Sequence, residues 1–252
     1  MINLILSGCN GKMGQVIARL CSEDASVKIV CGYDVNTEQR NSFPVVDDLS
    51  KFSGHADAII DFSHPDSLDS LLDYSEQTGV PIVVATTGLS MQQIARMAEH
   101  AKKAPVFSSA NMSLGVNLLV SLVKKAAAIL EGNFDIEIIE KHHNQKIDAP
   151  SGTALMIADE IASSLQGDTD YIYDRHCVRK KRDAHEIGIH SVRGGTIVGE
   201  HEVLFAGNDE LISISHTAMS KEIFAVGAIR AAKFLAGKQP GYYTMEDLID
   251  LG

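Results

Sequence analysis

The first hundred residues alternate between short apolar runs and longer segments with apolar residues at helical spacing. Val16, Ile17 and Leu20 mark the first helix, and further helices are predicted at 67–78 and 91–103. Strands are predicted before and between them, at 3–6, 27–33, 58–63, 81–85 and 106–107. Strands separated by helices in this way favour a parallel, doubly wound α/β domain.

The pattern changes after residue 114. A helix over 115–130 is apolar nearly all round, which is typical of a buried or interfacial helix. The strands predicted beyond it alternate in polarity, and they lie at 134–139, 187–193, 196–205 and 210–217. The turns at 194–195 and 207–209 are glycine-containing, so we expect hairpins and a mainly antiparallel sheet with one exposed face.

Two further segments complete the pattern. Residues 167–185 have little apolar periodicity and are expected to form a long loop or cover. An apolar helix at 223–235 resembles the α/β half in composition, and we expect it to pack back on the first domain.

The glycine turn after the first strand is a candidate nucleotide site. It reads Ser-Gly-Cys-Asn-Gly-Lys-Met-Gly over 7–14, which supplies a tight turn, room for a pyrophosphate and close packing of a helix on a strand. Asp34 follows the second strand about 20 residues later, where a ribose-binding carboxylate is expected. An acidic residue there favours NADH, although Lys12 leaves NADPH open. The alternative interpretation is a nucleotide-free βαβ unit.

Composition narrows the class of protein. The chain has 252 residues, 45% of them hydrophobic and 22% charged, which suits a globular protein with a sizeable core. A net charge of −11 argues against nucleic-acid and anionic-membrane partners. The four cysteines show neither paired nor zinc-ligand spacing, so no metal is expected. Without an apolar span or a leader pattern, we expect a cytoplasmic protein.

The basic run 179–182 is interpreted as a solvated loop. The alternative interpretation is that it attracts an acidic ligand.

The candidate functional residues of the second half lie mainly in residues 140–154. They read Glu-Lys-His-His-Asn-Gln-Lys-Ile-Asp-Ala-Pro-Ser-Gly-Thr-Ala, between a predicted strand and a helix that begins with Ser151 or Thr153. Free backbone N–H groups at Gly152 and Thr153, with the positive charge of Lys146, suit a small acidic substrate. His190, His201 and His216 lie on predicted strands and are interpreted as sheet residues.

The chain resembles the 4-hydroxy-tetrahydrodipicolinate reductase (dihydrodipicolinate reductase) family nearly end to end. The resemblance rests on the glycine turn, Thr-Thr-Gly at 86–88, the block 140–154, Ser-Val-Arg-Gly-Gly at 191–195 and Val-Gly-Glu-His at 198–201. It implies a Rossmann-like cofactor domain of residues 1–113 completed by 223–252. It also implies a central α+β domain over 114–222 that binds substrate and forms a homotetramer, with a mainly antiparallel or mixed open sheet. The implied reaction is NAD(P)H-dependent reduction of 4-hydroxy-tetrahydrodipicolinate in lysine and diaminopimelate biosynthesis.

The resemblance also implies roles for single residues. His142 matches the family's proton donor or acceptor and Lys146 its second proton donor, while His143, Gly152 and Thr153 match residues that bind the substrate carboxylates. The matching cofactor residues are Gly8, Cys9, Asn10, Gly11, Lys12 and Met13 for the pyrophosphate, Asp34 for the ribose, and Ala85, Thr86, Thr87, Ser109, Ala110, Asn111 and Met112 for the nicotinamide half. The role of Met112 would be through its backbone.

Two positions depart from the family pattern. Ala85 stands where a glycine is usual, which would crowd the backbone near the cofactor, and Lys221 stands where many members have an arginine suited to bidentate carboxylate contact.

Two other functions are weighed against this one. One is another two-domain dehydrogenase of amino-acid biosynthesis, such as one acting on aspartate semialdehyde or homoserine. The former would need a cysteine nucleophile before the substrate domain, and none of the four cysteines has such a position. A redox-sensing NAD-binding protein would keep Asp34 but would have no need for the block 140–154.

Overall fold

The computed structural model describes residues 1–176 and 178–249, so Cys177 lies outside the described residues. The chain forms two compact units. Unit 1 comprises Met1–Leu114 together with the described residues from Glu222 onward, and unit 2 comprises Gly115–Lys221. The helix expected at 223–235 is α6 (Glu222–Leu235), which belongs to unit 1.

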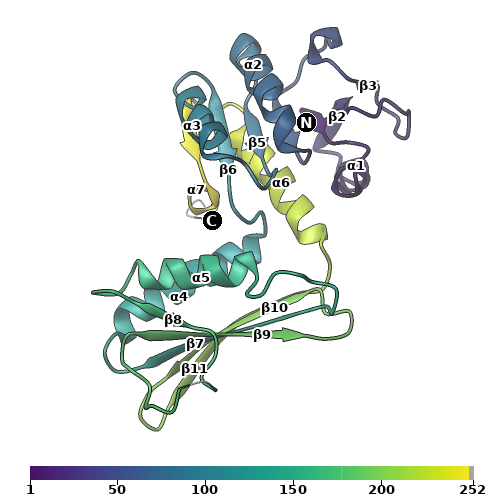
Figure 1. Cartoon of the computed structure of the whole chain (residues 1–252). Coiled ribbons are helices and arrows are strands. Elements are labelled where there is room, and N and C mark those ends of the chain that lie inside the picture. Colours follow the sequence, from purple (N-terminus) through teal and green to yellow (C-terminus); the bar gives the residue numbers. More distant parts are fainter. Residues whose placement is uncertain (177, 250–252) are drawn as a thin grey trace. The chain divides into compact units, whose positions relative to one another are not determined.

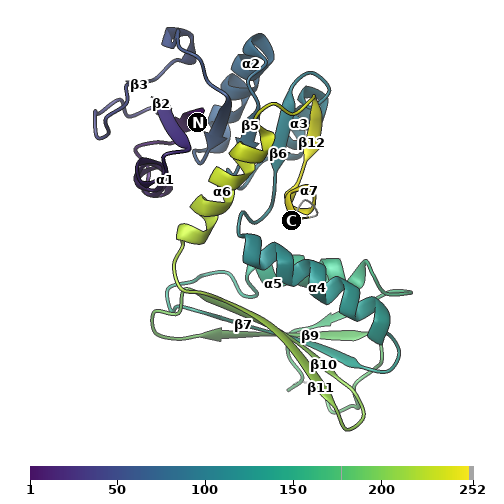
Figure 2. The same cartoon turned by 180° about the vertical axis from the view of Figure 1, so that it is seen from behind.

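Unit 1 is built on a seven-stranded parallel sheet (Figures 1 and 2). Its strands, in the order in which they lie, are β12 (Gly241–Tyr243), β6 (Pro105–Ser108), β5 (Ile82–Val84), β4 (Ala58–Asp61), β1 (Ile2–Ser7), β2 (Val27–Tyr33) and β3 (Val45–Val46). Every pairing is parallel. The predicted doubly wound α/β domain is therefore confirmed, with β3 and β12 as short edge strands that the apolar pattern did not show.

Helices cover both faces of this sheet. On one face, α1 (Lys12–Glu23) and α6 enclose a core that includes Leu4, Ile60 and Phe107. On the other, α2 (Leu68–Thr78) and α3 (Met91–His100) pack against Ile5 and Ile59. Strands buried on both faces read as continuous apolar runs, which explains why these segments lack a polar alternation. Short helices η1 (Leu49–Lys51), η2 (Pro65–Ser67) and α7 (Met245–Ile249) complete the unit.

Unit 2 is a five-stranded sheet with helices on one face. The order is β11 (Leu211–Ala218), β10 (Gly199–Ala206), β7 (Asp135–His142), β9 (Glu186–Arg193) and β8 (Asp170–Ile172). Helices α4 (Leu114–Leu130) and α5 (Gly152–Ala162) pack on the face formed by residues such as Ile138, Ile189 and Val203. β10 pairs antiparallel with β7 and β11, whereas β9 pairs parallel with β7 and β8, so the sheet is mixed.

The prediction of a hairpin at 194–195 was wrong. The two strands that it joins, β9 and β10, lie on opposite sides of β7. Because β7 and β9 are parallel, the chain between them makes a crossover, and this crossover includes helix α5. β9 pairs with one side of β7, and β10 pairs with the other. The connection passes over the end of β7, where the Gly194 N–H donates to the His142 carbonyl at 2.9 Å. The hairpin at 207–209 is present, and the loop predicted at 167–185 contains β8.

Helix α4 is buried on one side only. Leu119 and Val123 lie in the core, whereas Leu118, Leu122 and Ile129 are exposed in the single chain. No helix among the described residues is long and apolar enough to cross a membrane.

Close approach of α6 to a loop of unit 1 depends on Gly227. A Cβ atom there would overlap the carbonyl oxygen of Met112. We expect Gly227→Ala to lower the free energy of unfolding by about 1–3 kcal/mol, as overpacking usually does, measured by urea denaturation. Gly194→Ala is the control, because a Cβ at Gly194 meets no atom within 4 Å. Equal effects of the two substitutions would contradict this explanation.

Candidate active site

The glycine turn of unit 1 is shaped by contacts that exclude side chains. Gly8 has φ +75°, and a Cβ there would overlap the Phe62 carbonyl oxygen. A Cβ on Gly14 would in turn overlap the carbonyl oxygen of Gly8, so helix α1 starts directly against the turn. The Gly11 N–H donates to the Gly8 carbonyl at 3.0 Å and closes the loop.

Helix α1 begins at this turn with Gly11 as its N-cap. Gly11 has no side chain to bond the first-turn N–H groups, and no acidic residue lies in that turn. The N-terminus of α1 therefore keeps its partial positive charge and its donors for an anion. Lys12 is exposed beside them. These features fit the pyrophosphate of a dinucleotide.

Asp34 follows β2 and contacts the glycine turn. Its Oδ2 accepts from the Asn10 N–H at 2.9 Å, and its Oδ1 accepts from the Asn36 N–H at 2.9 Å. The Asn10 amide group donates to the carbonyls of Asn36 and Glu38. The turn and the loop after β2 are thus joined by backbone and side-chain bonds, which bring Asp34 beside Gly8–Met13.

A buried carboxylate organises the ends of β4 and β5. Asp61 is fully buried, and its oxygens accept from the Ser63 hydroxyl at 2.5 Å and the Thr86 hydroxyl at 2.7 Å. Thr86 accepts in turn from the Ser63 N–H at 3.0 Å. Burial raises the pKa of Asp61, although these hydrogen bonds oppose it. Ala85 and Thr86 are buried and Thr87 is exposed, so the predicted nicotinamide loop is anchored at its start and open at its end.

The loop after β6 is held by its own side chains. The Ser109 hydroxyl donates to the Asn111 carbonyl at 2.8 Å, and Asn111 Oδ1 accepts from the Ser113 N–H at 2.9 Å. Ala110 is exposed and Met112 is buried, with its carbonyl against Gly227 of α6. The four predicted residues 109–112 therefore form one fixed turn.

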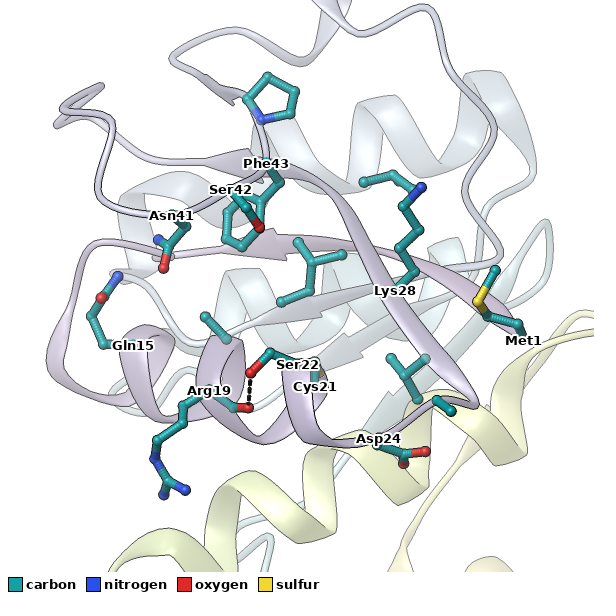
Figure 3. Close-up of a pocket in the computed structure, with 16 residues that line it drawn as sticks. Met1, Gln15, Arg19, Cys21, Ser22, Asp24, Lys28, Asn41, Ser42 and Phe43 are labelled. Atoms are coloured by element: carbon teal, nitrogen blue, oxygen red, sulfur yellow. Dashed lines mark hydrogen bonds between the residues drawn. The ribbon is translucent and has the colours of Figure 1, made fainter.

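A groove of about 690 Å³ lies elsewhere in unit 1 (Figure 3). It runs beside α1 and β2, with Ser22, Lys28 and Asn41 among its lining residues, and it includes none of the predicted cofactor residues. Two of its charged members are engaged, since Arg19 pairs with Glu23 and Glu222 and Asp24 pairs with Lys233. The groove is thus separate from the predicted nucleotide site.

The block 140–154 places His142 at the end of β7. Strand β7 extends to residue 142, three residues beyond the strand predicted from the sequence. His142 is 9% exposed, and its Nδ1 lies 2.6 Å from Oε2 of the fully buried Glu140. Glu140 also receives a bidentate pair from Arg193 on β9, at 2.8 and 2.6 Å. An ionised carboxylate only accepts hydrogen bonds, so His142 donates from Nδ1.

Lys146 and His143 lie in the turn that follows β7. The Lys146 N–H donates to the His143 carbonyl at 3.1 Å, and its ammonium group pairs with Asp148 at 2.9 Å. The positive charge of Lys146 contributes to lowering the pKa of His142, which places the two groups within electrostatic reach. His143 is half-buried. The structure thus brings the predicted proton-transfer pair together.

Helix α5 starts beside this pair. Ser151 is its N-cap, with the hydroxyl accepting from the Ala154 N–H at 3.1 Å, and the Ser151 N–H donates to Glu140 at 3.2 Å. Gly152 and Thr153 form the first turn, so the partial positive charge of the helix lies next to the histidine. The sequence left Ser151 and Thr153 open as caps, and the structure selects Ser151.

Burial and neighbouring cations set the protonation of the two histidines here. Burial lowers the pKa of His142, while Glu140 raises it and Lys146 and Arg193 lower it. Burial, with His142 as the next cause, lowers the pKa of His201 to about 4. The two rings meet edge to face at 5.2 Å, and His201 Nε2 lies 3.0 Å from the Ser151 hydroxyl. His201 is therefore a neutral sheet residue that supports the cap.

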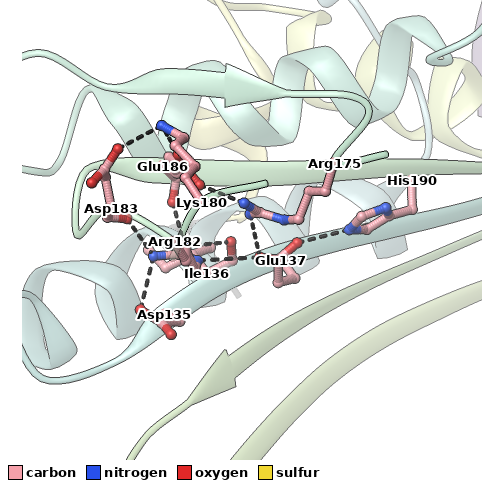
Figure 4. Close-up of polar contacts among 9 residues, drawn as sticks. All are labelled: Asp135, Ile136, Glu137, Arg175, Lys180, Arg182, Asp183, Glu186 and His190. Carbon is pink, nitrogen blue, oxygen red and sulfur yellow. Dashed lines mark hydrogen bonds and ion pairs between the residues drawn. The ribbon is translucent and has the colours of Figure 1, made fainter. Parts of the chain in front are cut away.

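The basic run at 179–182 takes part in an ion-pair cluster on unit 2 (Figure 4). Lys180 pairs with Asp183 and Glu186, at 2.6 and 2.9 Å. Arg182 pairs with Asp135 and Glu137, at 2.8 and 3.2 Å. Arg175 and His190 also contact Glu137. Two of the four basic residues thus connect this run to the sheet.

Sequence reasoning missed several partners of the predicted site residues. In the sequence, Glu140 and Arg193 stand out only as members of the family motifs, and Asp61 and Ser63 only as the end of a predicted strand. A signal for Glu140 exists once the strand is extended to residue 142, since Glu140 then lies two residues before His142 and shares its face. Arg193 and Asp61 could be connected to the site only through strand pairing, which the sequence did not give.

Two sequence models of one family match the chain. The N-terminal dihydrodipicolinate reductase model matches residues 2–112, and the C-terminal model matches residues 115–249. The chain is 54% identical over the full length of both proteins to a 4-hydroxy-tetrahydrodipicolinate reductase from Caldanaerobacter subterraneus subsp. tengcongensis. It is 49% identical to one from Clostridium novyi, over 99% of this chain and 98% of that protein.

Solved structures agree with the sequence relatives. A dipicolinate-bound dihydrodipicolinate reductase from Paenisporosarcina sp. TG-14 superimposes with a TM-score of 0.81 at 26% identity, over 97% of each chain. A probable dehydrogenase from Thermotoga maritima has a TM-score of 0.63 at 12% identity, over 98% of this chain and 92% of that one, and shares the fold alone.

Proposed function

The chain belongs to the dihydrodipicolinate reductase family, and on that premise we propose how its residues carry out the family's reaction. It is an NAD(P)H-dependent oxidoreductase that reduces 4-hydroxy-tetrahydrodipicolinate to tetrahydrodipicolinate. The observation that carries the proposal is the contact of His142 with the buried Glu140 beside Lys146 and the start of α5. This arrangement suits an anionic substrate that must receive a proton.

Unit 1 binds the cofactor, which supplies the hydride when bound. The turn Gly8–Met13 and the N-terminus of α1 would hold the pyrophosphate, because the first turn of α1 has no side-chain cap and Gly8 and Gly11 leave room for that anion. Residues 85–87 and 109–112 would hold the nicotinamide half through loops anchored by Asp61, Ser109 and Asn111.

Unit 2 supplies the proton. The 4-hydroxyl of the substrate leaves as water and an unsaturated ring remains. Hydride addition to that ring leaves negative charge on it, and His142 neutralises this charge by donating a proton. The pKa of His142 is lowered in the free protein, mainly by burial, but a bound dicarboxylate adds negative charge that favours the protonated ring. Lys146, 21% exposed and paired with Asp148, is the second proton donor.

The substrate carboxylates are held by donors around that pair. The first-turn N–H groups at Gly152 and Thr153 lie where the α5 dipole is positive, and His143 adds a ring donor. Dipicolinate, the ligand named for the Paenisporosarcina protein, is a cyclic dicarboxylate of the expected kind. This similarity supports the assignment of substrate class.

NADH is the preferred reductant in our proposal. Asp34 is fixed beside the glycine turn by two backbone N–H groups, and a carboxylate there bonds a ribose hydroxyl but repels a 2′-phosphate. Lys12, exposed at the first position of α1, permits some use of NADPH.

We also infer that the chain acts as a homotetramer. The helices of unit 2 cover one face of its sheet, and the other face carries exposed apolar residues, among them Val192 and Leu211. A sheet face with such residues is a suitable surface for association between copies.

The reaction is tested in a coupled assay. Pyruvate and aspartate semialdehyde are condensed enzymatically to generate the substrate, and the absorbance of NADH or NADPH is followed. We expect oxidation of both, with kcat/KM higher for NADH. Folded protein that oxidises neither cofactor above the rate without substrate would refute the proposed function.

Substitutions separate the proton donors from structural residues. We expect His142→Gln and Lys146→Ala each to reduce kcat by about tenfold or more, because each removes a proton donor. The affinity for NADH, measured by fluorescence titration, should stay nearly unchanged. Gln145→Ala, in the same turn, is the matched control and should retain activity. A parallel loss of cofactor binding would instead assign these residues a structural role.

The assembly is tested by light scattering. We expect a mass close to four times the 27.2 kDa of one chain. Leu211→Asp, on the open sheet face, should lower this mass, because it places a charge in an apolar contact. Met91→Asp, at a residue 80% exposed on α3 of unit 1, is the control. A monomeric wild-type protein would rule out the tetramer.

A further inference from the structure

Glu140 has no assigned role in the reaction, yet its carboxylate is one of the most heavily bonded groups of unit 2. Both oxygens receive an Arg193 N–H, one also receives the Ser151 N–H, and the other the His142 Nδ1–H. A hydroxyl contact from Ser191 is also present. Although burial opposes it, the bonds from Arg193, Ser191 and His142 lower the pKa of Glu140 to about 2. The carboxylate is therefore ionised at every working pH.

The direction of the contact with His142 fixes the tautomer of the imidazole. A carboxylate without a proton can only accept, so Nδ1 of His142 must carry hydrogen in the neutral ring as well as in the charged one. Nε2 then carries the exchangeable proton. Within the part of the chain that the structure describes, no hydrogen bond engages Nε2.

The opposite side of the ring is bounded by Gly199. A Cβ at this first residue of β10 would lie 3.1 Å from His142 Nε2 and 3.4 Å from Cδ2. The first distance is shorter than an ordinary van der Waals contact, so the Cβ of any other residue would crowd His142 Nε2. The ring is thus bonded at Nδ1 and left uncrowded at Nε2.

Arg193 links this arrangement to the substrate loop. Besides binding Glu140 at both oxygens, its Nη2 donates to the Asp148 carbonyl at 2.6 Å. Asp148 in turn pairs with Lys146. A bidentate arginine neutralises the buried carboxylate without occupying the oxygen lone pair that His142 uses.

We propose that Glu140 is a positioning residue that keeps the proton of neutral His142 on Nδ1, so that Nε2 is the atom that exchanges a proton with the substrate, in room left by Gly199. This inference rests on the proposed role of His142. In the forward direction the protonated ring releases its Nε2 proton to the substrate as the hydride is added. It becomes the neutral Nδ1–H tautomer and regains a proton from water.

The tautomer can be observed directly in the full-length wild-type protein. We expect nitrogen NMR of histidine-labelled protein to show His142 as the Nδ1–H tautomer at a pH above its pKa, with the signal assigned by its loss in His142→Gln. A ring protonated mainly at Nε2, or an even mixture, would overturn the proposal. This measurement needs no variant of Glu140 to fold.

Glu140→Gln tests the effect on the reaction. We expect kcat to fall by about tenfold or more while KM changes by less than about threefold, since the orienting partner of a proton donor acts on turnover. The groups that act on His142 are Glu140, Lys146, Arg193 and the neighbouring His201. Glu140 is the negatively charged member of this set. Its replacement by Gln lowers the pKa of His142 further, so the decline of kcat at alkaline pH moves to lower pH.

Controls separate this inference from the proposed function. Glu160→Gln on α5, which breaks a half-exposed ion pair with Lys124 of α4, should leave the pH profile unchanged. Adding Glu140→Gln to His142→Gln should cause no further loss, because Glu140 acts through that ring. A fully active His142→Gln enzyme would refute the proposed role of His142. An impaired His142→Gln enzyme together with a Glu140→Gln enzyme of wild-type pH profile would refute only the positioning role.

Discussion

The buried pair of Glu140 and Arg193 is the interaction on which the second unit's active groups depend. It joins the central strand β7 to β9, reaches the loop before α5 through the Asp148 carbonyl, and receives the first N–H of the α5 cap. An ion pair without water is costly unless every oxygen is bonded, and here the carboxylate is saturated. The strands, the loop and the helix therefore have one arrangement in which this charge is satisfied, and that arrangement fixes His142.

In unit 1 the predicted cofactor site is shaped by close backbone contacts, and not by a buried ion pair as in unit 2. Its cofactor loops are defined by places where no side chain fits: Gly8 against Phe62, Gly14 against Gly8 and Gly227 against Met112. Close backbone approach leaves N–H groups exposed at the start of α1, and these can bind an anion without a dedicated cation. Asp61, a buried acidic residue in this region, has hydroxyl partners, and it holds the ends of β4 and β5 together.

Much of this could be predicted from the sequence because the relevant signals are local. The parallel strands of unit 1, the long helix α4, and the α5 start at one of two named residues all follow from apolar spacing and capping chemistry. The pairing of β9 with β7 could not be predicted, because the glycines at 194–195 mimic a hairpin and strand order is a long-range property. For the same reason Arg193, 53 residues from Glu140, was not recognised as its partner.

The connection from β9 to β10 passes over the end of β7 and is bonded to the active histidine and to the residue two positions after it. The Gly194 N–H donates to the His142 carbonyl, and the Asn144 N–H donates to the Gly195 carbonyl. The turn at 207–209 closes a simple hairpin between β10 and β11 and can change length without moving a catalytic group. An insertion at 194–198 would instead pull on the backbone of His142. Of two surface turns with similar glycine content, only one is free to vary in length during evolution.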